Sequence, residues 1–162
     1  MSYPKQRILP LPKDQWTDAS REVQAFWGEP NAWEEGSRTS ILPVMANNPP
    51  LGQVFNIWGK HLLMENTLSA RVLEIIILRV AVKVNSAYEW HNHVGYGMNA
   101  GLTLEDIAAI RDYPAGGAWD ELEGAVLGSV EELIRDGTIS DATWAVLAGH
   151  FNTQQMMHLV LT

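Results

Sequence analysis

The stretch between Val72 and Val82 constrains the fold most strongly, because it is apolar on nearly every side of a helix and is interrupted only by Glu74 and Arg79. A helix that is hydrophobic all round is buried inside a protein or a membrane. Its longest apolar run, Ile75–Leu78, is far shorter than the ~20 residues that a membrane span needs. The sequence therefore predicts a helix at the centre of a globular core.

Helical signals continue on both sides of this stretch. Apolar residues recur at spacings of three and four from Leu51 onward. Capping signatures, in which a Ser, Thr or Asn precedes an acidic or amide residue by three positions, mark several helix starts. The predicted helices cover about 18–27, 51–65, 67–82 with Thr67 or Ser69 as N-cap, 86–100, 103–113, 119–135, 140–148 and a last one from Asn152. Since no strand, repeat or low-complexity tract is found, the sequence predicts an all-α fold.

The first 50 residues have a different texture, because they hold seven of the eight prolines. Each proline removes a backbone donor and restricts the preceding residue, so long regular structure is not expected there. Trp16, Phe26, Trp27 and Trp33 indicate an arm that packs onto its own domain or onto a neighbouring subunit. The predicted organisation is an N-terminal arm over 1–50 and a helical domain over 51–162.

Composition excludes several classes of function. The chain has no cysteine, which excludes disulfides, thiolate metal ligands and cysteine nucleophiles. Eleven basic and nineteen acidic residues give a formal net charge of -8, which repels phosphate backbones and argues against nucleic acid as a partner. Residues 1–5 lead into no signal-peptide core, so we expect a cytoplasmic protein without membrane contact.

The candidate chemistry lies on the buried helix and on the one that follows it. At about 100° per residue, one helical face holds Ser86, Glu89, Trp90, His93 and Gly97. Gly97 is expected to leave open space beside His93. A metal site is not expected, because His91 and His93 point about 200° apart on a regular helix. Glu74, Glu89 and His93 facing one apolar cavity would share protons as an acid and a base.

Structural explanations compete with this one for every residue. Glu74 in apolar surroundings would pair with Arg71 or Arg79. Ser86 and Glu89 also fit a capping box, and an inward histidine is more often a satisfied core residue. His61 lies on the predicted helix over 51–65, and its side chain points either into the pocket of Glu74, Glu89 and His93 or into solvent. His150 and His158 are expected at the surface or in an interface.

The sequence resembles the carboxymuconolactone decarboxylase family, the all-helical relatives of alkylhydroperoxidase D. The resemblance rests on Arg71–Ala81, on Tyr88–Trp90 with His93 three residues further, and on Gly101–Thr103 before an acidic helix start. It extends weakly over about residues 38–160. The family's characterised decarboxylase releases carbon dioxide from a carboxylated muconolactone in aromatic catabolism, without metal or organic cofactor.

The peroxidase branch of this family has a Glu followed after twelve and fifteen positions by two redox cysteines and after nineteen by a His. Counted from Glu74, these offsets fall on Ser86, Glu89 and His93. Without either cysteine, disulfide-cycling peroxidase chemistry cannot operate. The resemblance therefore points to the decarboxylase branch, whose Tyr-Glu-Trp-x-x-His pattern the chain matches.

What the resemblance implies is a lyase that acts on a small carboxylated lactone or related cyclic acid and binds no cofactor. His93 would donate the proton, Glu89 would orient or relay to it, and Glu74 would hold the imidazolium charge. The predicted substrate-binding residues are Ser86, Tyr88, Trp90, His61 and Arg79, with Arg38 as an alternative to Arg79. The family fold implies an obligate homo-oligomer, a homotrimer or hexamer, with a small-molecule substrate as its other partner.

Two other hypotheses remain open from the residues alone. One is a different proton-transfer enzyme, an isomerase or hydrolase, that uses the same Glu-His site. The other is a non-catalytic oligomeric helical module for ligand binding, in which Glu74, Glu89 and His93 form a buried structural network.

Overall fold

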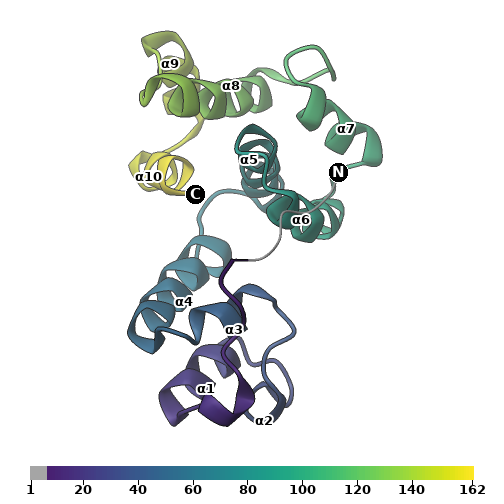
Figure 1. Cartoon of the computed structure of the whole chain (residues 1–162). Coiled ribbons are helices and arrows are strands. Elements are labelled where there is room, and N and C mark those ends of the chain that lie inside the picture. The colour runs from purple at the N-terminus through teal and green to yellow at the C-terminus, as the bar shows by residue number, and fades with distance from the viewer. Residues whose placement is uncertain (1–6) are drawn as a thin grey trace. The chain divides into compact units, whose positions relative to one another are not determined.

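The computed structural model describes residues 7–162, and these residues form ten α-helices, one short 3-10 helix and no strand (Figure 1). This confirms the predicted all-α fold. Residues 1–5, over which no signal-peptide core is expected, lie outside the described part of the chain. The elements are η1 (Lys13–Gln15), α1 (Asp18–Ala25), α2 (Ala32–Glu35), α3 (Ile41–Met45), α4 (Pro49–Met64), α5 (Ala70–Lys83), α6 (Ala87–Asn99), α7 (Leu104–Asp112), α8 (Glu121–Asp136), α9 (Asp141–His150) and α10 (Thr153–Leu161).

The helices divide into two compact units, one that ends at Glu65 and one that runs from Asn66 to Thr162. The predicted division into an arm over 1–50 and a domain over 51–162 stays a prediction. No helix within residues 7–162 is long and apolar enough to cross a membrane.

The first unit is held together where α1 packs on α4. Asn56 of α4 is fully buried; its amide donates to the Val23 carbonyl at 2.9 Å and accepts from the Trp27 indole at 3.0 Å. Gly52 allows the close approach of the two helices, because a Cβ there would lie 2.8 Å from a methyl group of Val23. The short helices α2 and α3 were not predicted, since four or five residues carry no periodic signal.

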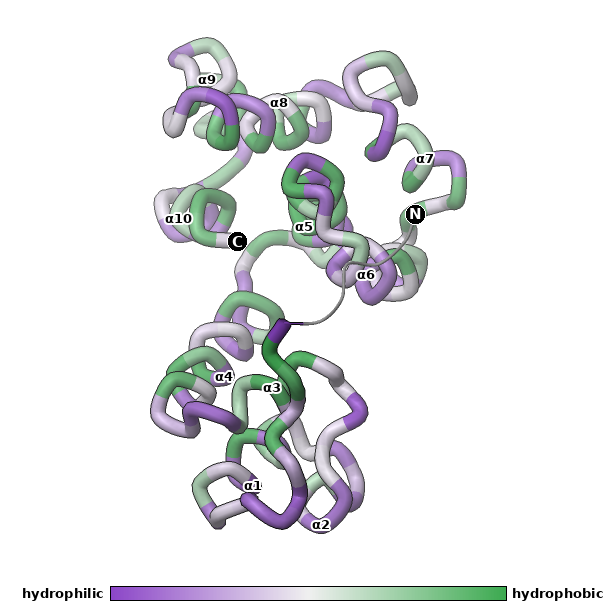
Figure 2. The backbone as a smooth tube through the Cα atoms, in the orientation of Figure 1, coloured by the Kyte–Doolittle hydropathy of each residue, from purple (hydrophilic) through white to green (hydrophobic). Residues whose placement is uncertain are grey.

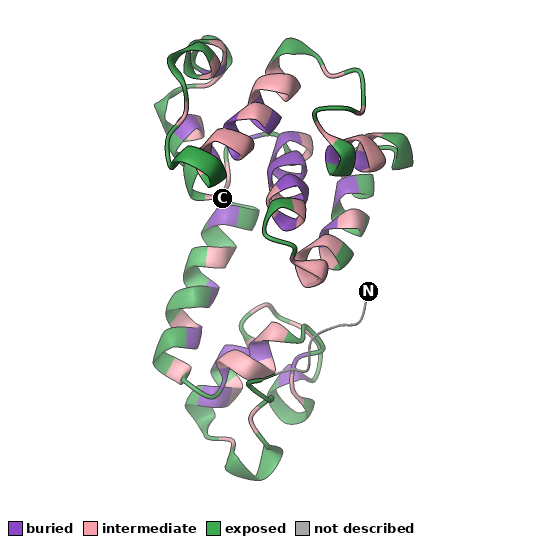
Figure 3. Cartoon of the chain, turned by 45° about the horizontal axis from the view of Figure 1, so that its top comes forward, coloured by how far each residue is buried: buried purple, intermediate pink, exposed green. Residues whose placement is uncertain are grey.

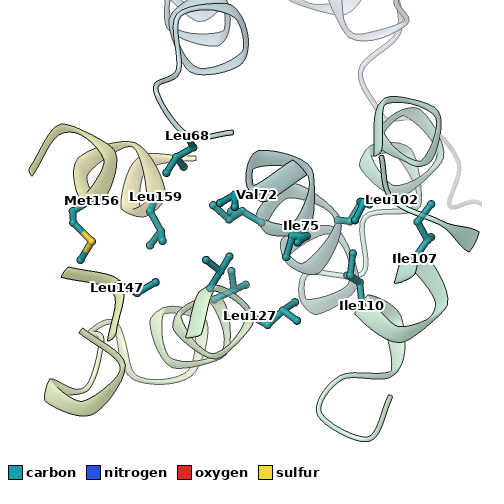
Figure 4. Packing of buried hydrophobic residues seen from close by; sticks show 14 residues of the cluster. Leu68, Val72, Ile75, Leu102, Ile107, Ile110, Leu127, Leu147, Met156 and Leu159 are labelled. Atoms are coloured by element: carbon teal, nitrogen blue, oxygen red, sulfur yellow. The ribbon is translucent and has the colours of Figure 1, made fainter. Parts of the chain in front are cut away.

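The second unit is built around α5, which packs against α6, α7 and α8. Figure 2 shows α5 as hydrophobic over most of its length, and Figure 3 shows most of it buried. Its apolar side chains join those of the surrounding helices in one core, whose buried residues Figure 4 draws as sticks. The core residues of this cluster are Leu68, Val72, Ile75, Ile76, Leu78, Leu102, Ile107, Ile110, Val126, Leu127, Val130, Leu147, Met156 and Leu159.

The predicted helix ends lie within two residues of the observed ones, except that α5 begins three residues after the earlier of its two predicted starts. Ser69 caps α5, and the capping boxes of Thr103 and Asn152 start α7 and α10. Thr67 is not the cap; its amide N–H donates instead to His158 Nδ1 at 3.1 Å. His158 is therefore buried against this segment, and the expectation of a surface or interface position is wrong for it.

Candidate functional site

A buried carboxylate and imidazole lie side by side between α5 and α6. Glu74 Oε2 is 2.9 Å from His93 Nδ1, and only 7% and 8% of the two residues are exposed. An ionised carboxylate only accepts hydrogen bonds, so with Glu74 ionised the proton of this bond resides on Nδ1. The bond orients the ring and leaves Nε2 as the nitrogen that can exchange a proton with a third group.

Gly97, one turn after His93, is what lets α5 and α6 come this close. A Cβ at Gly97 would lie 3.0 Å from Leu102 Cδ1 and 3.2 Å from Leu78 Cδ1. Both leucines are buried, so this space is already filled. The prediction of a void beside His93 is therefore wrong. The missing side chain at Gly97 instead allows the two helices to pack closely.

Glu89 lies on the other side of the imidazole, one turn before His93. Its Oε2 is 3.7 Å from His93 Nε2, within ion-pair range but too far for a hydrogen bond, and its side chain is 47% exposed. Ser86 caps α6 by accepting from the Glu89 amide at 3.3 Å. The amide of Ser86 donates to the Ala81 carbonyl at 2.8 Å. Since that amide is already bonded, the Glu89 carboxylate is not needed for a capping box and lies beside the histidine.

Arg79 lies elsewhere in the core and closes the end of α7. It is buried, and its guanidinium donates to the carbonyls of Ile110, Arg111 and Tyr113 at 2.8–3.0 Å. These carbonyls are among the groups that a helix end leaves without partners. Its Nε donates to Glu131 at 2.7 Å. The structure does not bring Arg79 to the Glu74–His93 pair.

Arg71 has the same type of role at the opposite end of α5. Its guanidinium donates to Glu123 at 2.7 Å, to Asp106 at 3.1 Å and to the Gly101 carbonyl at 2.8 Å. The partner of Glu74 is thus His93 and neither arginine, so the predicted pairing with Arg71 or Arg79 is wrong.

Two carboxylates that accept hydrogen bonds from these arginines have lowered pKa values. At Glu131, burial raises the pKa, but hydrogen bonds from Lys83 and Arg79 and their positive charges outweigh it and hold the pKa below 4.5. At Asp106, the hydrogen bond from the Thr103 amide is the main cause, and Arg71 adds to it, so the pKa lies below 3.8. Both carboxylates are therefore ionised structural partners at neutral pH.

The other predicted site residues are placed in different surroundings. Trp90 is partly buried and packs against the core cluster, while Tyr88 is half-buried. His61 belongs to the first unit, where its Nδ1 is 2.9 Å from Glu65 Oε2. Arg38 is in that unit as well and pairs with Glu29 at 2.6 Å.

One neighbour of His93 is not among the predicted site residues. The ring of Tyr96 lies 5.4 Å from the His93 ring, centroid to centroid, with the two planes tilted by 56°. Its position three residues after His93 and seven after Glu89 places it on the same helical face. This spacing is a signal that could have identified it.

The comparisons with known proteins bear on the region that holds this group. The family model described as the carboxymuconolactone decarboxylase family matches residues 49–132, slightly more than half of the chain. The match spans α4 to α7 and most of α8, and it includes Glu74, Glu89 and His93. No curated protein and no solved structure matches the chain.

Proposed function

Because the chain belongs to the carboxymuconolactone decarboxylase family, we propose that it is a cofactor-independent decarboxylase for a small carboxylated lactone or a related cyclic acid. The family includes decarboxylase-like and peroxidase-like enzymes. The dithiol chemistry of the latter needs cysteine thiolates, and this chain contains none. The decarboxylase class is therefore the one that its residues support.

The reaction breaks the bond between the substrate ring and its carboxylate carbon. Carbon dioxide leaves without the bonding electron pair, which a conjugated lactone carbonyl accepts as a dienolate. One proton must then reach the dienolate carbon. The task of the protein is to deliver this proton from a fixed position and to stabilise the charges on both sides of the transfer.

His93 fits the role of proton donor. In the imidazolium form, Nδ1–H donates to Glu74 at 2.9 Å, and the buried carboxylate stabilises the positive charge of the ring. Donation from Nε2–H to the dienolate leaves the neutral imidazole with its Nδ1–H bond intact. Glu89, half-exposed and 3.7 Å from Nε2, is placed to return a proton from solvent.

The observation that carries this proposal is the buried Glu74–His93 pair whose free nitrogen faces the more exposed Glu89. The roles of Ser86, Tyr88, Trp90, His61 and Arg79 in substrate binding stay predictions, as does a cytoplasmic location. Self-association into a trimer or hexamer is part of the proposal, and light scattering that gives a monomer at micromolar concentration would contradict that part.

The test is carbon dioxide release from 4-carboxymuconolactone by three proteins. We expect turnover by the wild type, a loss of at least about a thousandfold in His93→Ala because the proton donor is gone, and wild-type rates in His91→Ala. His91 is a matched control, because it is exposed and lies on the same helix. Circular dichroism should show equal helix content in all three.

The outcomes separate the hypotheses. Equal rates in His93→Ala and the wild type would overturn the role of His93. Conversion of the substrate without carbon dioxide would instead indicate an isomerase or hydrolase at the same site. No conversion of this or any other carboxylated lactone would favour the non-catalytic module.

A further inference from the structure

Four residues of α6 flank His93 on its own helical face, and they divide into two pairs. Measured around the helix axis, Trp90 and Gly97 lie about 40–60° to one side of His93, and Glu89 and Tyr96 lie about 40–60° to the other. Trp90 and Gly97 pack toward the core. The side chain of Glu89 is 47% exposed, and Tyr96, taken as a whole residue, is 59% exposed. The solvent side of the buried imidazole is therefore bordered by one carboxylate and one aromatic ring.

From this arrangement we infer that Tyr96 is a substrate-contacting residue, whose ring packs against a flat, unsaturated ring of the substrate while His93 Nε2 delivers the proton. The inference rests on the proposed function. It identifies both the recognition element and the substrate feature recognised, a planar carboxylated ring rather than a puckered one.

The distances support this assignment. A proton donor must come within about 3 Å of its acceptor atom. The Tyr96 ring is 5.4 Å from the His93 ring and tilted to it by 56°, within the range of aromatic pairs, which is about 4.5–7 Å. A substrate ring brought to Nε2 from the solvent side enters the space between Tyr96 and Glu89.

Charge favours Tyr96 over Glu89 as the packing surface. A carboxylated substrate is an anion, and close contact with the Glu89 carboxylate is repulsive. The tyrosine ring offers a neutral face with large apolar area that needs little ordering. The substrate ring therefore lies against Tyr96, with its carboxylate directed away from Glu89.

The test uses a planar and a puckered probe of similar size, benzoate and cyclohexanecarboxylate, with binding to the full chain followed by NMR titration. We expect the wild type and Tyr96→Phe to prefer benzoate by about fivefold or more. Tyr96→Leu should weaken benzoate binding about tenfold, which corresponds to the loss of one aromatic pair, and leave cyclohexanecarboxylate within about twofold. Met98→Ala is the matched control, because Met98 is 50% exposed on the same helix and points away from His93.

A kinetic measurement separates contact with substrate from mere support of the histidine. With 4-carboxymuconolactone, Tyr96→Leu should raise KM about tenfold and change kcat less than about threefold. A fall in kcat at constant KM, or an equal loss of both probes, would overturn the inference, as would the absence of any preference in the wild type. The planar preference with no carbon dioxide release from any carboxylated lactone would refute the proposed function and leave the ring-binding role of Tyr96 standing.

Discussion

The two sides of helix α5 use buried charge in opposite ways. Toward α7 and α8, Arg79 is bonded to three carbonyls and to Glu131, so its guanidinium is occupied by structural partners. Toward α6, Glu74 has one histidine as its partner, and the second nitrogen of that histidine lies beside a half-exposed carboxylate. An arginine keeps its proton at all accessible pH values, whereas an imidazole can act as both a proton donor and a proton acceptor.

This difference shows which buried charges hold the fold and which are available for chemistry. Arg71 and Arg79 bond the carbonyl groups near the ends of α6 and α7 to α5, and removal of either leaves polar groups without partners. The Glu74–His93 pair makes one hydrogen bond, which joins α5 to α6. It can lose its charge by moving one proton, so its substitution should affect reactivity more than stability.

The largest effect on stability is expected from Arg79→Met. The change leaves the carbonyls at the end of α7 unpaired and removes one of the two cations at Glu131. Breaking a buried ionic group in this way costs about 3–5 kcal/mol, which urea unfolding measures as a lower midpoint at constant m value.

Arg111→Met is the control for this change. Arg111 pairs with its neighbour Asp112 in an ion pair in which both side chains are more than half exposed, and such pairs contribute little. Its free energy of unfolding should stay within about 0.5 kcal/mol of the wild type. Equal losses in both variants would remove the distinction between the structural side of α5 and the surface.

A smaller effect is expected from Glu131→Gln, and it should depend on pH. The folded pKa of Glu131 is lowered, because hydrogen bonds from Lys83 and Arg79 outweigh the effect of burial. Its carboxylate therefore contributes stability that is present above pH 4.5, its ordinary value, and is lost as the pH falls through the folded pKa.

At pH 7 we expect Glu131→Gln to lose about 2 kcal/mol, the contribution of a charged hydrogen bond. The difference from the wild type should shrink in urea titrations as the pH falls below 4.5 and through the lowered folded pKa of Glu131. A difference that stays constant over this range would show that the charge of Glu131 does not hold this side of α5.

The smallest effect is expected at the glycines of α6. Gly97→Ala places a Cβ 3.0 Å from buried Leu102, and the cost of crowding exceeds the gain in helix propensity, for a net loss of about 1 kcal/mol. Gly95→Ala meets no atom within 4 Å and should gain about 0.5–1 kcal/mol. Thermal unfolding should thus shift in opposite directions, and a gain in both would contradict the close packing of α5 on α6.

The parts of the fold that the sequence predicts are those with local signals. Ser69, Thr103 and Asn152 each cap a helix through an amide three residues away, so the signal and the structure occupy the same short segment. The helices α2 and α3 could not be predicted, because a helix shorter than two turns has no recognisable apolar periodicity.

The site could be predicted only in part, because its contacts depend on packing between helices. The i and i+4 spacing brings Glu89 near His93 within one helix. The bond from Glu74 crosses to the next helix, and the carbonyls that Arg79 binds are more than thirty residues away. Periodicity places Gly97 on the correct face, but whether a glycine leaves a void or admits a neighbour depends on Leu78 and Leu102.

The most direct test of the contrast is to measure Glu74→Gln for stability and turnover together. The glutamine oxygen can still accept from Nδ1–H of a neutral His93, so this donor keeps its acceptor and no buried charge is left unpaired. We predict an unfolding midpoint equal to or above that of the wild type, and carbon dioxide release from 4-carboxymuconolactone at least about a hundredfold slower because the imidazolium has lost its counter-charge. A loss of stability as large as that of Arg79→Met, with turnover unchanged, would contradict the account and make the pair a structural bond.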